Sequence, residues 1–148
     1  MNKNELLTCF KAYDVRGKIG KELNNEIAYQ IGRATAQSLK ANSIALGFDA
    51  RATSSDLAHS AAKGICDAGS DVFRIGLAGT EEMYAAVSGF NACGGIEVTA
   101  SHNPIDYNGM KIVKHNSQPL SHQELFSIKH IAEQKCYTRS ERFGLVID

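Results

Sequence analysis

Residues 43–77 read SIALGFDARATSSDLAHSAAKGICDAGSDVFRIGL. In this stretch the short apolar run Ser43–Phe48 predicts a buried strand, and Asp71–Leu77 predicts a second one. Apolar residues recur at helical spacing between the two runs, which predicts a helix that ends at Gly69. Thr53–Asp56 fits a capping box at the start of that helix. A strand, a helix and a strand at this spacing favour a layered α/β domain.

The same pattern extends over the rest of the chain. A helical period begins after Gly20, and Thr80 is expected to cap a further helix. Cys93–Thr99 predicts a third strand, and the run Gly109–Val113 follows it too closely for a crossover helix, so the two are expected to pair antiparallel. Ser121–Glu124 is an S-x-x-E capping box that opens a last helix. These elements predict a mixed, mostly parallel sheet covered by helices.

Composition and charge narrow the class of protein. The chain has 148 residues, with 16 Lys and Arg balanced by 16 Asp and Glu. A formal net charge of zero argues against a nucleic-acid partner, which would require a basic face. No apolar stretch approaches the roughly 20 residues of a membrane span, and the N-terminus has no apolar run typical of a secretory signal. The cysteines lack zinc-ligand spacing and are expected to be reduced thiols in a cytoplasmic protein: Cys9, Cys66, Cys93 and Cys136.

Three polar groups of residues are expected where strands run into loops, the usual ligand face of an open α/β sheet. They are a predicted loop at Tyr13–Gly17, the segment Asp49–Arg51, and the turn Thr99–Pro104, which Lys111 follows shortly afterwards. Arginine offers two parallel hydrogen bonds to a phosphate, and lysine offers it a point charge. A serine on a tight turn can present its hydroxyl to a reacting phosphorus. The residues alone therefore indicate an α/β domain suited to phosphate.

Structural explanations of the same residues stay open at this stage. Adjacent side chains point in different directions, so Ser101 and His102 are not by themselves a nucleophile and its base. Asp49 and Arg51 could simply pair with each other or cap the following helix. Lys111 could be a surface lysine on an edge strand.

Three motifs resemble one enzyme family. TASHNP at 99–104 followed by YNGMK at 107–111 resembles the phosphoserine signature of the α-D-phosphohexomutases. FKAYDVRG at 10–17 resembles the N-terminal active-site loop of that family, and GFDAR at 47–51 also fits its pattern. The motifs stand in the family's order. By this resemblance, residues 1–148 would form the first of four domains that together enclose an active-site cleft.

The resemblance implies a role for each polar residue. Ser101 would carry the phosphoryl group, donate it to a sugar hydroxyl and recover it from the other end of a hexose 1,6-bisphosphate intermediate, which also serves as activator. Mg²⁺ would contact the phosphoryl group on Ser101. Lys111 and Arg16 would stabilise charge on the transferring group, with Lys111 assisting proton movement. The remaining implied residues would line the phosphohexose pocket: Tyr13, His102 and Asn103. Asn103 and Pro104 would also fix the turn.

The motifs favour the mannose-specific branch of the family. The expected reaction converts mannose 6-phosphate to mannose 1-phosphate, which supplies GDP-mannose for capsule or lipopolysaccharide sugars. One alternative is glucose phosphate as substrate within the same family, and another is a stand-alone phosphosugar-binding module without catalysis. The family's Asp-Gly-Asp-x-Asp-Arg metal loop does not occur in the sequence, and an apolar run at 143–147 stops one residue before the end. The chain is therefore expected to lack domains II–IV and to be inactive alone.

Overall fold

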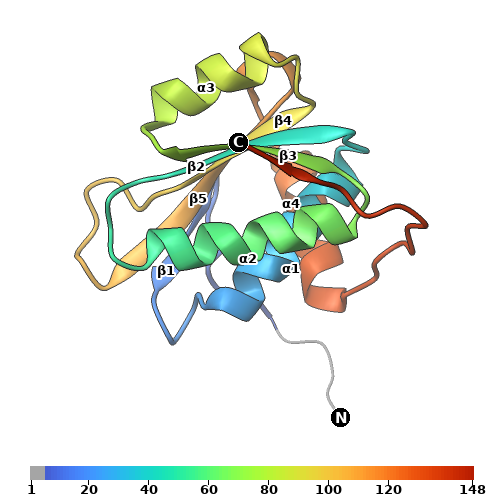
Figure 1. Cartoon of the computed structure of the whole chain (residues 1–148). Coiled ribbons are helices and arrows are strands. Elements are labelled where there is room, and N and C mark those ends of the chain that lie inside the picture. The colour runs from blue at the N-terminus through green and yellow to red at the C-terminus, as the bar shows by residue number, and fades with distance from the viewer. Residues whose placement is uncertain (1–5) are drawn as a thin grey trace.

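A computed structural model describes residues 6–148 as one mixed sheet with helices on both faces (Figure 1). Its elements are β1 (Val15–Lys18), α1 (Asn25–Ser38), β2 (Ser43–Phe48), α2 (Ser54–Asp67), β3 (Asp71–Leu77), α3 (Thr80–Gly89), β4 (Gly94–Val98), β5 (Tyr107–Lys114), the 3₁₀ turn η1 (His115–Ser117), β6 (Gln118–Pro119), α4 (His122–Gln134) and β7 (Val146–Ile147). The predicted strands at 43–48, 71–77, 93–99 and 109–113 are confirmed as β2, β3, β4 and β5.

The strand directions confirm the mixed, mostly parallel sheet. Its order is β1-β5-β4-β2-β3-β7, and β6 pairs with β5. The neighbours β4, β2, β3 and β7 run parallel, whereas β5 runs antiparallel to β1, β4 and β6. Within the described residues, every strand except β5 therefore points in the same direction. The short connection between β4 and β5 explains the exception, because it leaves no room for a crossover helix.

The two faces of the sheet pack against different layers (Figure 1). Helices α1, α2 and α4 cover one face, where Ile31, Leu57 and Ile128 belong to the larger apolar core together with Ile96 of β4. Helix α3 covers the opposite face and contributes Met83 to a smaller core. Successive residues of a strand point to opposite faces, so each central strand serves both layers.

Two predicted element boundaries are wrong. In each case the backbone hydrogen bonds of the folded chain begin the element at a residue other than the predicted one. The predicted loop at Tyr13–Gly17 contains the start of β1, because Arg16 pairs with Gly109 of β5. Helix α3 is capped at Gly79 instead of Thr80, and the backbone N–H of Gly79 donates to Oε1 of Glu82 at 2.6 Å.

Of the two predicted capping boxes, one is confirmed and one is wrong. Oγ of Ser121 accepts from the backbone N–H of Glu124 at 3.1 Å, and Oε1 of Glu124 accepts from the backbone N–H of Ser121 at 2.7 Å. At α2 the side chain of Thr53 makes no capping hydrogen bond. Its hydroxyl instead accepts from the side-chain amide of Asn108, on β5.

This topology brings the ends of β2 and β4 to the same edge of the sheet. The two strands are parallel neighbours, and the backbone N–H of Asp49 donates to the carbonyl of Val98 at 3.0 Å. The segments that follow the two strands, beginning at Asp49 and at Thr99, therefore meet at this edge. None of the helices in residues 6–148 has the length and apolar character needed to cross a bilayer.

Candidate active site

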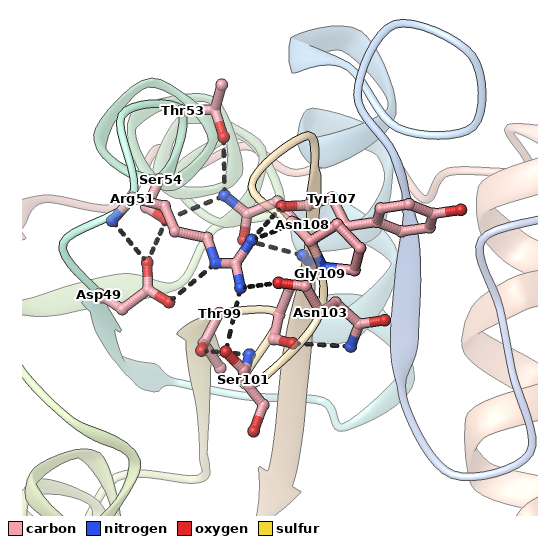
Figure 2. Close-up of polar contacts among 12 residues, drawn as sticks. Asp49, Arg51, Thr53, Ser54, Thr99, Ser101, Asn103, Tyr107, Asn108 and Gly109 are labelled. Carbon is pink, nitrogen blue, oxygen red and sulfur yellow. Dashed lines mark hydrogen bonds and ion pairs between the residues drawn. The ribbon is translucent and has the colours of Figure 1, made fainter.

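Ser101 lies at the tip of a tight turn after β4 (Figure 2). Its φ of 56° is left-handed, a conformation that costs a residue other than glycine free energy and is often found at functional sites. The backbone N–H of Ser101 donates to Oγ1 of Thr99 at 3.0 Å. Both the backbone N–H and the side-chain amide of Asn103 donate to the carbonyl of Ala100, at 3.0 and 2.8 Å. The turn is thus fixed from within, while the Ser101 side chain is exposed.

The guanidinium of Arg51 holds the same turn from outside (Figure 2). Its two terminal nitrogens donate to four backbone carbonyls within residues 101–107. Its Nε lies 3.8 Å from Oδ2 of Asp49. Of the structural alternatives for these two residues, the pairing of Asp49 with Arg51 is present, but Arg51 also spans the gap between the two loops.

A buried polar network continues from Asp49 to β5. Oδ1 of Asp49 accepts from the hydroxyl of Ser54 at 2.5 Å and from the backbone N–H of Arg51 at 3.0 Å. The side-chain amide of Asn108 donates to Ser54 Oγ at 2.9 Å, and its carbonyl accepts from the backbone N–H of Gly109 at 2.8 Å. The start of α2 and the start of β5 are therefore tied together.

Arg16 and Lys111 lie on the two strands beside this network. Arg16 of β1 pairs with Gly109 of β5, and the carbonyl of Gly109 accepts from the backbone N–H of Thr99 at 2.9 Å. Lys111 is two residues further along β5 and is half-buried. Only glycine fits at position 109, since a Cβ there would lie 2.0 Å from the Val15 carbonyl oxygen. The close approach of β1 brings Arg16 to the edge that carries Ser101.

Tyr13 and His102 both have exposed side chains. The Tyr13 side chain is 78% exposed, and its ring lies edge-on to His122 of α4 with a centroid distance of 4.9 Å. His102 is exposed in the turn next to Ser101. The structure gives Asn103 a role inside the turn, through its two bonds to Ala100. Contact of these three residues with a substrate stays a prediction.

Sequence reasoning missed Glu97, which is fully buried in the centre of the sheet. It lies opposite Lys111 in the β4–β5 register, and neither carboxylate oxygen has a hydrogen-bond partner among the described residues. Burial raises the pKa of the Glu97 carboxyl to about 8, and the nearby carboxylates of Asp49 and Glu82 add to the rise. The available signal was a charged residue inside the otherwise apolar run GGIEV.

The residues that could hold a metal are few. Within residues 6–148 no three His, Cys, Asp or Glu side chains are grouped as a metal site requires. Ser101, once phosphorylated, would offer phosphate oxygens on an exposed turn, which suits Mg²⁺ because that ion binds phosphates with only one or two carboxylates.

Comparison with known protein families shows which family the chain belongs to. The family model for the phosphoglucomutase/phosphomannomutase α/β/α domain I matches residues 7–138. The chain belongs to this family. The resemblance carried by TASHNP, YNGMK, FKAYDVRG and GFDAR is thereby confirmed, and so is the expectation of an enzyme family.

Close relatives within the family carry the name phosphomannomutase. A Klebsiella pneumoniae protein of that name is 54% identical over 129 residues, which cover 86% of this chain and 82% of the relative. An Escherichia coli phosphomannomutase is 58% identical over 116 residues, which cover 78% of this chain but 26% of the relative. The chain thus spans most of one relative and about a quarter of the other.

A solved structure of the family has the same fold. The crystal structure of a phosphoglucomutase/phosphomannomutase family protein from Burkholderia thailandensis superposes with a TM-score of 0.84 at 29% sequence identity. The match covers 93% of this chain and 32% of the Burkholderia chain. The α/β/α layering therefore corresponds to about a third of a larger family member.

Proposed function

We propose that this chain is the phosphoserine domain of a phosphohexomutase that converts mannose 6-phosphate to mannose 1-phosphate. The observation that carries the proposal is the exposed hydroxyl of Ser101 on a left-handed turn whose backbone is held by Arg51. Phosphoryl transfer depends on positioning and charge stabilisation more than on a strong nucleophile, so a rigid turn with an accessible hydroxyl suits it.

The proposed chemistry consists of two transfers of opposite direction. In the first, the phosphorus–oxygen bond to Ser101 breaks as a bond to a sugar hydroxyl forms, and the hydroxyl proton passes to the serine oxygen. The sugar then carries two phosphates and turns over. In the second, its other phosphate returns to Ser101, and the serine proton passes to the sugar oxygen. The net result is an isomerisation that regenerates the phosphoserine.

Arg16 and Lys111 are the proposed charge-stabilising residues. Both lie on strands next to the Ser101 turn, and Arg16 is linked to it through Gly109 and Thr99. Their positive charges oppose the charge on the transferring phosphoryl group. Tyr13, His102 and Asn103 are proposed to face the sugar phosphate, and Mg²⁺ bound at the Ser101 phosphate would neutralise part of its charge.

The finer biological assignment rests on the relatives. Mannose is favoured over glucose because the relatives described above are named phosphomannomutase. We place the product in the supply of GDP-mannose for surface polysaccharide and the protein in the cytoplasm, where its four free cysteines would stay reduced. The partners of this domain would be domains II–IV of a longer chain, and the 148 residues alone would not turn over substrate.

The test is intact mass, phosphopeptide mapping and a coupled mutase assay on the protein purified untagged from its own cells. We expect one phosphoryl group on Ser101. With Mg²⁺ and hexose 1,6-bisphosphate, we expect faster turnover of mannose phosphate than of glucose phosphate. Ser101→Ala should lose both the phosphorylation and the turnover. Ser55→Ala, on the exposed first turn of α2, is the matched control and should retain full activity. An unmodified Ser101 in a protein without turnover would falsify the proposal and favour a binding module.

A further inference from the structure

The guanidinium of Arg51 reaches from its own loop to the serine loop, and all of its hydrogen bonds there go to main-chain carbonyls. Arg51 follows β2, whereas its acceptors follow β4, about fifty residues later in the chain. The side chain is only 12% exposed, although it lies at the edge of the sheet. Its hydrogen bonds go from Nη1 to the carbonyls of Pro104 at 2.6 Å and Tyr107 at 2.9 Å, and from Nη2 to the carbonyls of Ser101 at 3.0 Å and Asn103 at 2.6 Å.

These contacts occupy every N–H donor on the two terminal nitrogens of Arg51. An arginine side chain has five N–H donors in a fixed planar fork. Four of them are used by the loop carbonyls, and the fifth, on Nε, makes no hydrogen bond but lies 3.8 Å from Oδ2 of Asp49, its ion-pair partner. Asp49 is itself held by the Ser54 hydroxyl and by the backbone N–H of Arg51. An arginine beside a phosphoryl site would ordinarily be taken for a bidentate phosphate ligand. In this arrangement the only N–H without a hydrogen bond is on Nε, which faces a carboxylate, so a bidentate phosphate contact is excluded.

The hydrogen bonds of Arg51 are placed where they restrain the orientation of Ser101. One of the four accepting carbonyls belongs to Ser101 itself, whose left-handed backbone needs external restraint. Two others belong to Asn103 and Pro104, on the far side of the same turn. Because the guanidinium is planar and rigid, it fixes these carbonyls relative to one another. Lysine could not do so, since its ammonium is a point charge without the fork geometry.

We propose that Arg51 is a positioning residue that aims the Ser101 oxygen for in-line phosphoryl transfer without touching the substrate. The proposal rests on the function proposed above for Ser101. It extends that function to a residue on a different loop, and it predicts that kcat depends on Arg51 while substrate affinity does not.

The test compares Arg51→Ala and Arg51→Lys with Arg74→Ala in the complete enzyme. Arg74 is a matched control, because it is another arginine with a carboxylate partner, but it lies on β3 and pairs with Asp148. For Arg51→Ala we expect kcat to fall roughly 100-fold, as for a reacting group displaced by about 1 Å, with KM near the wild-type value. Free guanidinium ion should restore part of kcat in Arg51→Ala. Arg51→Lys should stay slow, and Arg74→Ala should match the wild type.

Three results would overturn the proposal. A wild-type kcat in Arg51→Ala would show that the serine loop keeps its orientation without the hydrogen bonds from Arg51. A raised KM with a normal kcat would make Arg51 a substrate ligand. If Arg51→Ala fails to fold, Arg51→Lys decides the matter by the same comparison. Hydrogen exchange of residues 99–107 in the 148-residue chain separates this inference from the function. Faster exchange in the Arg51 variants is expected even if the wild type proves to have no mutase activity. Unchanged exchange would contradict the claim that Arg51 restrains the backbone of this loop.

Discussion

Asn108 shows at the scale of one residue how the serine loop is anchored to the domain. Its side chain is fully buried, and both amide hydrogens are used, by Thr53 Oγ1 at 2.8 Å and Ser54 Oγ at 2.9 Å. Its carbonyl oxygen accepts from Gly109. A buried group that loses its partner costs about 1–3 kcal/mol, so each bond in this set matters for stability.

We expect Asn108→Ala to lower the free energy of unfolding by about 2–3 kcal/mol, because it removes the acceptor of the buried Gly109 backbone N–H and the donor to the Thr53 and Ser54 hydroxyls, and leaves a small cavity. Urea denaturation of the 148-residue chain measures the change. Asn25→Ala, at an exposed position on the first turn of α1, is the control and should lie within about 0.5 kcal/mol of the wild type. Equal effects of the two substitutions would show that the Asn108 network adds no stability.

The sequence predicted the turn around Ser101 and Asn103 as a residue that fixes it, but not that Arg51 holds the turn from another loop. The turn is local, since Asn103 and Thr99 bond within two or three positions of Ser101 and Ala100. Arg51 finds its acceptors fifty or more positions away, and no local pattern encodes that contact. A similarly long separation along the sequence explains the wrong capping prediction at Thr53, because its hydroxyl accepts from Asn108 instead of capping the helix.

At the scale of elements, α1 and α2 pack closely enough to require glycine on both helices. A Cβ at Gly32 of α1 would lie 2.3 Å from the carbonyl oxygen of Ala61, and one at Gly64 of α2 would lie 2.2 Å from that of Tyr29. Both contacts are with backbone, which cannot move aside as a flexible side chain would. Helical spacing predicted the two helices, but which faces meet is a property of the folded chain.

Gly64→Ala should therefore destabilise the domain by about 1–3 kcal/mol, the usual range for overpacking, even though alanine favours a helix by about 1 kcal/mol over glycine. Thermal denaturation followed by circular dichroism measures the effect. Gly89→Ala is the control, since position 89 is helical and a Cβ there meets nothing within 4 Å. The packing argument fails if Gly64→Ala melts at or above the temperature of Gly89→Ala.

At the scale of the whole molecule, the sheet buries one carboxyl, that of Glu97, for which residues 6–148 offer no hydrogen-bond partner. Oε1 of Glu97 lies so close over β2 that a Cβ at Gly47 would be 2.7 Å from it. The pKa of Glu97 is raised from the ordinary 4.5 to about 8, chiefly by burial. The folded protein therefore keeps a proton that the unfolded chain has already released, across the whole interval between these two values.

The sign of the pH dependence follows from this difference. Stability contributed by Glu97 is fully present below pH 4.5 and falls as the pH rises, by about 1.4 kcal/mol per pH unit for one proton, until the folded state ionises near pH 8. Glu97→Gln removes the titration and keeps the size of the side chain. The free energy of unfolding of Glu97→Gln minus that of the wild type should therefore grow from pH 5 to pH 8 and then level off. Urea titrations of both chains at unit pH steps measure it. A difference that is the same at every pH would mean that the substitution acts through packing alone and that Glu97 is ionised in the folded sheet.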